Sequence, residues 1–231
     1  MANILFDALF QNHESTDKPF LVTKDDAVIT YSHFLELTAQ IAHTLTKSNV
    51  TPGDRVAVQV QKSPQALAVY AACIQSGAVF LPLNTAYTPS EIEYFVSDAE
   101  PKLVICDAKS EAALAPIADK NNAGLHTLNA DGSGSLTEAA AKEPASFDTI
   151  DRAENDLAAI LYTSGTTGRS KGAMLSHLNL LSNAQSLIEY WKFTEKDTLL
   201  HALPIFHTHG LFVATNVSLL AGGTMIFLPG F

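Results

Sequence analysis

The chain has 231 residues, and its 14 lysines and arginines against 24 aspartates and glutamates give a formal net charge of −10. A hydrophobic share of 47% with only 16% charged residues is typical of a globular protein with a large buried core, and it excludes disordered, fibrous and coiled-coil classes. The length fits one large domain or two small ones. Because the chain is acidic and has no cluster of basic residues, we expect no nucleic-acid partner.

The cysteines and the two ends of the chain bear on its compartment. Cys73 and Cys106 lie in apolar stretches, without a second cysteine or a histidine at metal-ligand spacing, so we interpret them as reduced core residues of a cytoplasmic protein. The N-terminus lacks the basic start of a secretory signal.

Residues 210–231 carry no charge, but polar residues interrupt this apolar run and Gly222 and Gly223 break it. This pattern predicts a helix, a turn and a buried strand, and no membrane span.

Strand and helix patterns alternate along the chain. Apolar runs predict strands at 20–23, 27–30, 55–60, 78–83, 102–106, 124–128, 157–162, 173–175, 198–203 and 224–228. Helical spacing and cap residues predict helices at 34–45, 64–76, 89–97, 110–121, 177–191 and 210–220. Strands separated by helices pair in parallel, so we expect an α/β fold with layered parallel sheets flanked by helices.

Some details of this fold can also be predicted. The polar stretches 129–134 and 142–155 are expected to be long surface connections that divide two sheet layers. Ser176 is expected to cap the helix that follows it. Trp191 and Phe193, at the end of that helix, are interpreted as core residues.

The segment from Tyr162 to Gly172 leaves a predicted buried strand and combines three features that suit a polyphosphate. Its glycines permit positive φ and close backbone approach, its hydroxyl groups donate hydrogen bonds, and Lys171 supplies a positive charge. The glycines are Gly165, Gly168 and Gly172, and the hydroxyl-bearing residues are Thr163, Ser164, Thr166, Thr167 and Ser170.

This segment is neither of the two common nucleotide-binding motifs. The P-loop pattern requires a glycine at position 170 and a hydroxyl at 172, where this chain has Ser170 and Gly172. The dinucleotide pattern G-x-G-x-x-G is absent. A flexible surface turn is the structural alternative, but the strands on both sides and the lysine favour phosphate binding.

The segment resembles the phosphate-binding loop of the adenylate-forming superfamily, which includes acyl-CoA synthetases, luciferases and peptide-synthetase adenylation domains. Its one departure is Ser170, where the family most often has proline. Three further stretches are similar to family motifs in the same order: 53–57, 76–84 and the Pro-Ile-Phe-His-Thr-His-Gly segment at 204–210. The resemblance covers the whole chain, and within the family it is strongest to the malonyl-CoA synthetase branch, at 81–88, 156–168 and 201–216.

The resemblance implies a reaction, its cofactors and its site residues. Malonate and ATP would form malonyl-AMP and pyrophosphate, and CoA would then give malonyl-CoA and AMP. The residues implied in binding the ATP phosphates are Thr163, Ser164, Gly165, Thr166, Thr167, Gly168 and Lys171. Thr163 would also contact Mg²⁺, and His207 would line the acid pocket. The alternative for His207, and more so for His201 and His209, is a structural histidine with satisfied hydrogen bonds.

The resemblance also indicates what these residues lack. Family members are more than twice as long and carry later motifs that contact adenine, ribose and Mg²⁺, followed by a small C-terminal domain with a catalytic lysine. None of these occurs here, so we expect residues 1–231 to be a partial AMP-binding N-terminal domain without the C-terminal domain, without a complete catalytic set and inactive alone. The alternatives are a ligase for another acid, a carrier-loading adenylation domain, and a remnant that binds nucleotide or a partner without catalysis.

Overall fold

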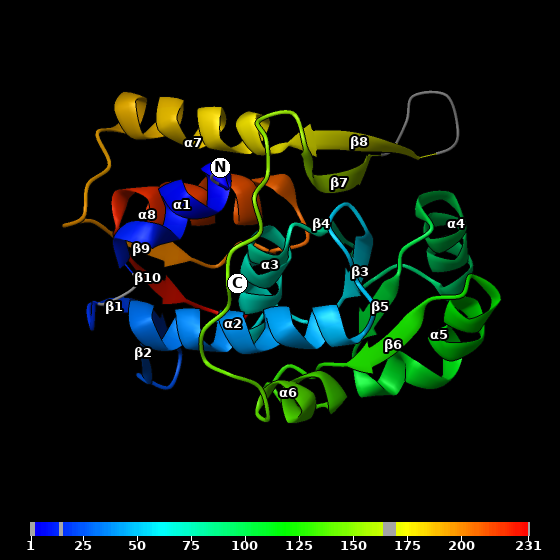
Figure 1. The fold of residues 1–231 in the computed structure, drawn as a ribbon. Helices are drawn as coiled ribbons and strands as arrows, with labels where there is room; N and C mark the ends of the chain where they lie inside the picture. The colour runs from blue at the N-terminus through cyan, green and yellow to red at the C-terminus, as the bar shows by residue number, and fades with distance from the viewer. Residues whose placement is uncertain (1–2, 14–15, 164–169, 231) are drawn as a thin grey trace.

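The computed structural model describes residues 3–13, 16–163 and 170–230. Its strands form two sheets, one of six strands and one of four, with helices packed between and around them (Figure 1). This arrangement confirms the predicted α/β fold of layered sheets flanked by helices.

The larger sheet has the strand order β6-β5-β3-β4-β7-β8. Its first five strands are parallel, and β8 runs antiparallel to β7. The prediction of parallel sheets is therefore wrong for β8, because the connection from β7 to β8 is too short for a crossover helix. The bounds of these strands are β3 Arg55–Gln59, β4 Val79–Pro82, β5 Leu103–Cys106, β6 Gly124–Thr127, β7 Leu157–Thr163 and β8 Lys171–Ser176.

The smaller sheet joins the beginning of the chain to its last strands, in the order β2-β1-β10-β9. Strands β1, β10 and β9 are parallel, and β2 forms the predicted hairpin with β1. The bounds are β1 Pro19–Thr23, β2 Val28–Thr30, β9 Thr198–His201 and β10 Thr224–Phe227.

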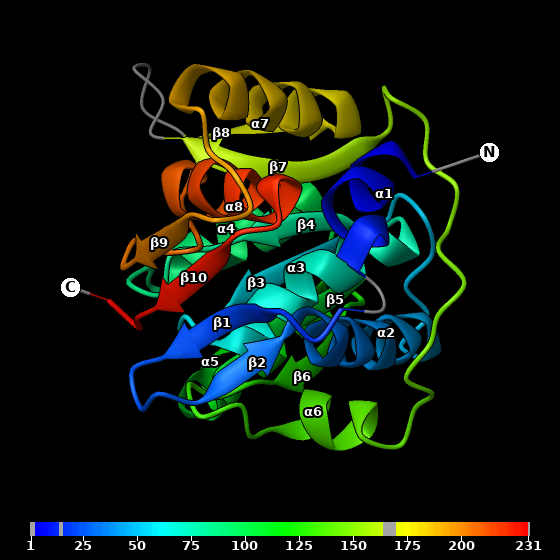
Figure 2. The same ribbon diagram turned by 90° about the vertical axis from the view of Figure 1, so that its left-hand side faces the viewer.

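The helices form two apolar cores with the sheets. The larger core joins both sheets through α1, α2, α3, α7 and α8, and the smaller one joins α4 and α5 to the opposite face of the six-stranded sheet. Figure 2 shows α3 in the middle of the molecule. The helices are α1 Ile4–Phe10, α2 Tyr31–Lys47, α3 Pro64–Ser76, α4 Pro89–Ala99, α5 Ala108–Lys120, α6 Ser135–Ala140, α7 His177–Trp191 and α8 Asn216–Ala221, together with the short η1 Gln11–His13 and the π-helix η2 His209–Thr215.

Local cap signals explain why several helices begin where the sequence predicts. Ser63 accepts a hydrogen bond from the Ala66 amide at the start of α3, whose first residue is proline. Ser176 caps α7 as predicted, and the Asn179 side chain completes a reciprocal capping box. Both helices have the predicted bounds.

The long polar connection does not divide the two sheets. Strands β6 and β7, which flank the stretch between 129 and 155, belong to the same six-stranded sheet. That stretch carries α6 and then runs from β6, at one edge of this sheet, to β7, next to the strand at the opposite edge (Figure 1). The prediction was wrong because strand order depends on long-range packing that local polarity does not encode.

Exposed apolar side chains gather near α7 and on the four-stranded sheet. Trp191 is 55% exposed and the neighbouring Tyr190 87% exposed, so the prediction that Trp191 is a core residue was wrong, while Phe193 is half-buried. On the sheet, Leu200 of β9 and Ile226 of β10 are exposed within the described part of the chain.

The uncharged segment near the end of the chain folds as a helix, a turn and a strand. The π-helix η2 and then α8 are followed by Gly222, whose φ of 70° ends α8, and by strand β10. Among the described residues no helix is long and apolar enough to cross a membrane.

Both cysteines are buried free thiols, as predicted. Burial raises the pKa of both, and that of Cys106 to about 12. Each is therefore a protonated, unreactive core side chain at neutral pH.

His177, the first residue of α7, is fully buried, and neither ring nitrogen has a hydrogen-bond partner among the described residues. Burial, with a smaller effect of Arg152, lowers its pKa to about 4 from a usual 6.5. As the pH falls through this window the unfolded chain takes up the proton first, so stability is lost between about pH 6.5 and pH 4.

We therefore expect His177→Phe, which keeps a ring but cannot titrate, to lose less stability in acid. Between pH 7 and about pH 4.5 the free energy of unfolding should fall by on the order of 2 kcal/mol less than in the wild type. Urea denaturation at the two pH values measures this difference. An equal loss in both proteins would show that His177 does not contribute to acid unfolding.

Candidate functional site

The predicted phosphate-binding segment connects β7 to β8. These strands form an antiparallel ladder that ends where Thr163 lies opposite Lys171. Both residues are exposed, and the Thr163 hydroxyl lies 3.5 Å from the Lys171 carbonyl oxygen. The structure thus brings together the first and last of the predicted phosphate-binding residues, while Ser164, Gly165, Thr166, Thr167 and Gly168 lie outside the described residues.

Helix α4 braces this end of the hairpin. The Tyr94 hydroxyl donates a 2.9 Å hydrogen bond to the carbonyl oxygen of Ser170, and the Tyr162 hydroxyl donates to the Asp98 carboxylate. Burial, reinforced by the nearby Asp98, raises the pKa of Tyr162, so its hydroxyl stays a donor. Phe95 packs against the rings of both tyrosines. Sequence reasoning missed this brace, although Tyr94 and Asp98 are spaced to lie on one face of a helix.

Gly172 contributes close packing, and not the unusual backbone conformation that we expected of it. It lies within β8 and is absent from the described glycines with positive φ. A Cβ there would approach the Ile160 side chain of β7 to 3.0 Å. A larger residue would therefore require the Ile160 side chain to shift beside Lys171.

The three histidines of the 201–210 region have different environments. His207 and His209 are exposed, and their rings stack with centroids 5.5 Å apart. His201 is only 1% exposed. The structure therefore leaves His207 free to face a ligand, and it confirms the structural alternative for His201.

His201 belongs to a buried polar network. Its Nδ1 accepts a 2.8 Å hydrogen bond from Lys62 Nζ, and its Nε2 lies 2.8 Å from the Gly210 carbonyl oxygen. Burial, with a smaller effect of Lys62, lowers the pKa of His201 to about 4, and burial lowers the pKa of Lys62 to about 7. Sequence reasoning missed Lys62, because nothing local marks a lysine that pairs with a histidine 139 positions away.

The β7–β8 hairpin and the His207 segment lie on one side of the molecule. Strands β7, β9 and β10 all point their carboxyl ends toward the left of Figure 2. Ligands of parallel α/β sheets bind outside this edge. The arrangement suits a ligand with an anionic part near Lys171 and a second polar part near His207.

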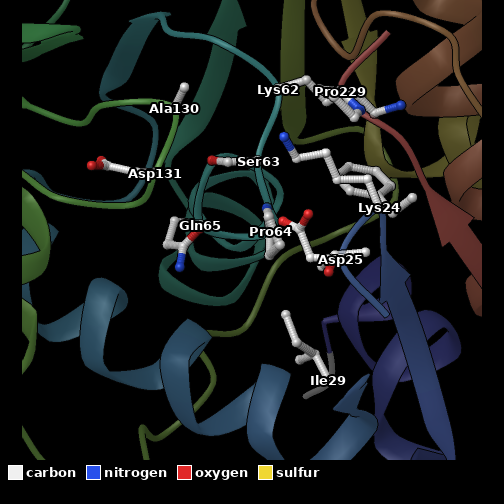
Figure 3. A pocket seen from close by; sticks show the side chains of 12 residues that line it. Lys24, Asp25, Ile29, Lys62, Ser63, Pro64, Gln65, Ala130, Asp131 and Pro229 are labelled. Atoms are coloured by element: carbon white, nitrogen blue, oxygen red, sulfur yellow. The ribbon is translucent and has the colours of Figure 1, made fainter. Parts of the chain in front are cut away.

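A separate cavity of about 290 Å³ lies at the carboxyl ends of β1, β3 and β10 (Figure 3). Lys62 and Phe227 form part of its wall, and Lys24, Asp25 and Asp131 lie around it. Of the predicted phosphate- and acid-binding residues that the structure describes, Thr163, Lys171 and His207, none lines this cavity.

The described residues contain no group of three or more histidine, cysteine, aspartate or glutamate side chains that would hold a metal ion. The exposed hydroxyl of Thr163 is a hard oxygen donor of the kind that Mg²⁺ accepts. It suits a Mg²⁺ ion that takes its other ligands from phosphate groups and water.

Comparison with known proteins identifies the family. The sequence profile of the AMP-binding enzyme family matches residues 10–231. The chain belongs to the AMP-binding enzyme family. It is 33% identical, over 94% of its length and 42% of the relative's, to a probable CoA ligase, CCL9, of Humulus lupulus. It is 35% identical, over 68% of its length and 27% of the relative's, to the mitochondrial malonate–CoA ligase ACSF3 of Xenopus laevis.

A solved structure is similar over the whole chain. Apo MatB from Rhodopseudomonas palustris is 52% identical, with a TM-score of 0.97 over 100% of this chain and 46% of MatB. ATP-bound MatB from the same organism matches equally well, at 53% identity. The chain thus spans less than half the length of these relatives.

We expect Tyr94→Phe, which removes only the hydroxyl, to loosen the end of the hairpin. The loss of this half-buried hydrogen bond should lower the free energy of unfolding by about 1 kcal/mol. Hydrogen exchange of the amides at 170–172 should become faster. Tyr190→Phe, at a highly exposed tyrosine, is the control and should change neither quantity. Equal exchange in Tyr94→Phe and wild type would show that α4 does not brace the hairpin.

Proposed function

We propose that this chain is the N-terminal part of an ATP-dependent acid–thiol ligase that forms malonyl-CoA from malonate, ATP and CoA through malonyl-AMP. The observation that carries the proposal is the braced β7–β8 hairpin, which presents Thr163 and Lys171 together in a chain of the AMP-binding enzyme family. The rest of the catalytic set and the CoA-dependent step are assigned to a part of the protein beyond residue 231. The two buried free thiols suit a reducing, cytoplasmic setting.

The chemistry explains why these residue types are needed. When a carboxylate attacks the α-phosphate of ATP, negative charge builds up on the departing pyrophosphate. We assign Lys171 and the hydroxyls of Thr163, Ser164, Thr166 and Thr167 to the stabilisation of that charge, and Mg²⁺ held near Thr163 would supply further positive charge. Positioned charges of this kind act most strongly when they need no reorganisation, which is what the brace from α4 provides.

Small dicarboxylic acids are favoured as substrates by the names of two relatives, one of which specifies malonate. One curated relative is a malonate–CoA ligase, and another, 32% identical, is an oxalate–CoA ligase of Arabidopsis thaliana. Both names specify small dicarboxylates. His207 is assigned to the second carboxylate, since its exposed imidazole is able to donate a hydrogen bond to it.

A ligase for a different acid is the second candidate. A feruloyl-CoA synthase of Amycolatopsis is 34% identical over 88% of this chain. Similarity at this level therefore extends to enzymes that are named for aromatic acids. The two candidates differ in the acid that they adenylate, and the same assay separates them.

We expect the complete gene product to catalyse ATP–pyrophosphate exchange that depends on malonate. Oxalate, acetate, ferulate and amino acids serve as competing substrates. Exchange with malonate should exceed that with acetate by about 10²-fold or more, because a site with a partner for the second carboxylate leaves that partner unsatisfied by acetate. Exchange with ferulate and none with malonate would overturn the malonate assignment and keep the ligase.

Lys171→Met in the complete gene product tests the phosphate site. We expect adenylation to fall by about 10²-fold or more, because the charge that stabilises pyrophosphate is removed. The melting temperature should stay close to that of the wild type, since Lys171 is exposed. Lys192→Met, at an exposed lysine after α7, is the matched control. Full activity in Lys171→Met would contradict the proposed role.

A further inference from the structure

The segment that carries His207 has no strand or α-helix of its own between residues 202 and 207, yet its two ends are tied together. His201 is the last residue of β9, and Gly210 lies in η2. The His201 Nε2 atom lies 2.8 Å from the Gly210 carbonyl oxygen. Loops that present ligand-binding groups need such ties, because an untethered segment of this length samples many conformations.

The hydrogen-bond partners of His201 determine its tautomer. Lys62 Nζ donates a hydrogen bond to the His201 carbonyl oxygen at 2.7 Å, and it lies 2.8 Å from Nδ1 of the same residue. Nδ1 therefore accepts, and the proton of the neutral ring lies on Nε2. Nε2–H then donates to the Gly210 carbonyl oxygen, to which the Thr215 hydroxyl also donates at 2.9 Å. Lys62 thus orients the imidazole that closes the segment.

Packing restricts the same segment from two other sides. The Cα of Gly210 lies so close to the Pro204 carbonyl that a Cβ would come within 2.0 Å of its oxygen. Ile205 is buried against the carboxyl ends of β3 and β4, where a cavity of only about 10 Å³ remains. The Leu211 amide donates to the His207 carbonyl oxygen, which joins His207 to η2.

The composition of this network is costly for a purely structural element. Lys62 is 8% exposed, and besides its contacts with His201 its Nζ lies over the face of the Phe227 ring, at 4.3 Å from the centroid. Burying a lysine and a histidine costs desolvation free energy that apolar residues of the same size do not lose. Such groups occur where a defined geometry is needed, and π-helical turns such as η2 also gather at functional sites.

We propose that Lys62 and His201 are positioning residues for the acid substrate. They hold segment 202–210 in the one shape that presents His207 to the carboxylate. This inference rests on the proposed function, since it assigns an effect on acid binding to a network that does not itself contact the acid.

Substitutions at His201 in the complete gene product test the proposal. His201→Leu removes the donor to the Gly210 oxygen, and we expect the KM for malonate to rise by about tenfold or more while the KM for ATP changes by less than about twofold. His201→Gln keeps an N–H group within reach of that oxygen and should recover most of the malonate affinity. His177→Phe, at a buried histidine outside the network, is the control and should leave both KM values unchanged.

Hydrogen–deuterium exchange supplies a readout that does not depend on turnover. In His201→Leu and in Lys62→Met, amides of 202–210 should exchange faster than in the wild type, and those of β3 and β7 should not. If wild-type protein adenylates no acid but the exchange result holds, the proposed function fails and the structural tie stands. If wild-type protein is active and His201→Leu raises the two KM values equally, or neither, the positioning role is wrong.

Discussion

The burial of α3 is the constraint on which the rest of the structure depends. All residues of this helix from 66 to 76 are buried, and a helix that is apolar all round is stable only when other elements enclose it. Its Tyr70 contacts Phe80 of the six-stranded sheet and Phe212 of η2. The helix therefore fixes that sheet relative to the π-helix that follows the His207 segment. Its first residue directly follows Ser63 and the buried Lys62, so the same helix start also fixes the donor that orients His201.

Both parts of the candidate site depend on this frame. The β7–β8 hairpin is an extension of the six-stranded sheet, and the His207 segment follows a strand of the four-stranded sheet. Polar contacts hold each part in place. Tyr94 and Asp98 of α4 contact the hairpin, and Lys62 and His201 tie the His207 segment. The exposed, polar edge that we assign to binding is thus supported by a half-buried contact at the hairpin and a buried network at the His207 segment, and preorganised electrostatic catalysis needs fixed groups of this kind.

The sequence predicted what local patterns determine. Helices α3 and α7 have the predicted bounds because Ser63 and Ser176 are strong caps that act within one helical turn. Motif similarity predicted the family, which the comparisons confirm, whereas the assignment of Thr163 and Lys171 to phosphate binding stays a prediction. The assignment of strands to sheets, the exposure of Trp191 and the role of Lys62 were not predictable, because each depends on residues far away in the chain. Lys62 and His201, 139 positions apart, show this most clearly.

We propose that the β7–β8 hairpin binds the phosphates of ATP and that the His207 segment binds the acid that reacts with it. A crystal structure of the complete gene product with malonate and the α,β-methylene analogue of ATP tests this most directly. We predict the phosphates against Thr163 and Lys171, with one malonate carboxylate near the α-phosphate and the other within hydrogen-bond distance of His207. Phosphates or malonate bound instead in the cavity between Lys24, Lys62 and Asp131 would contradict this assignment.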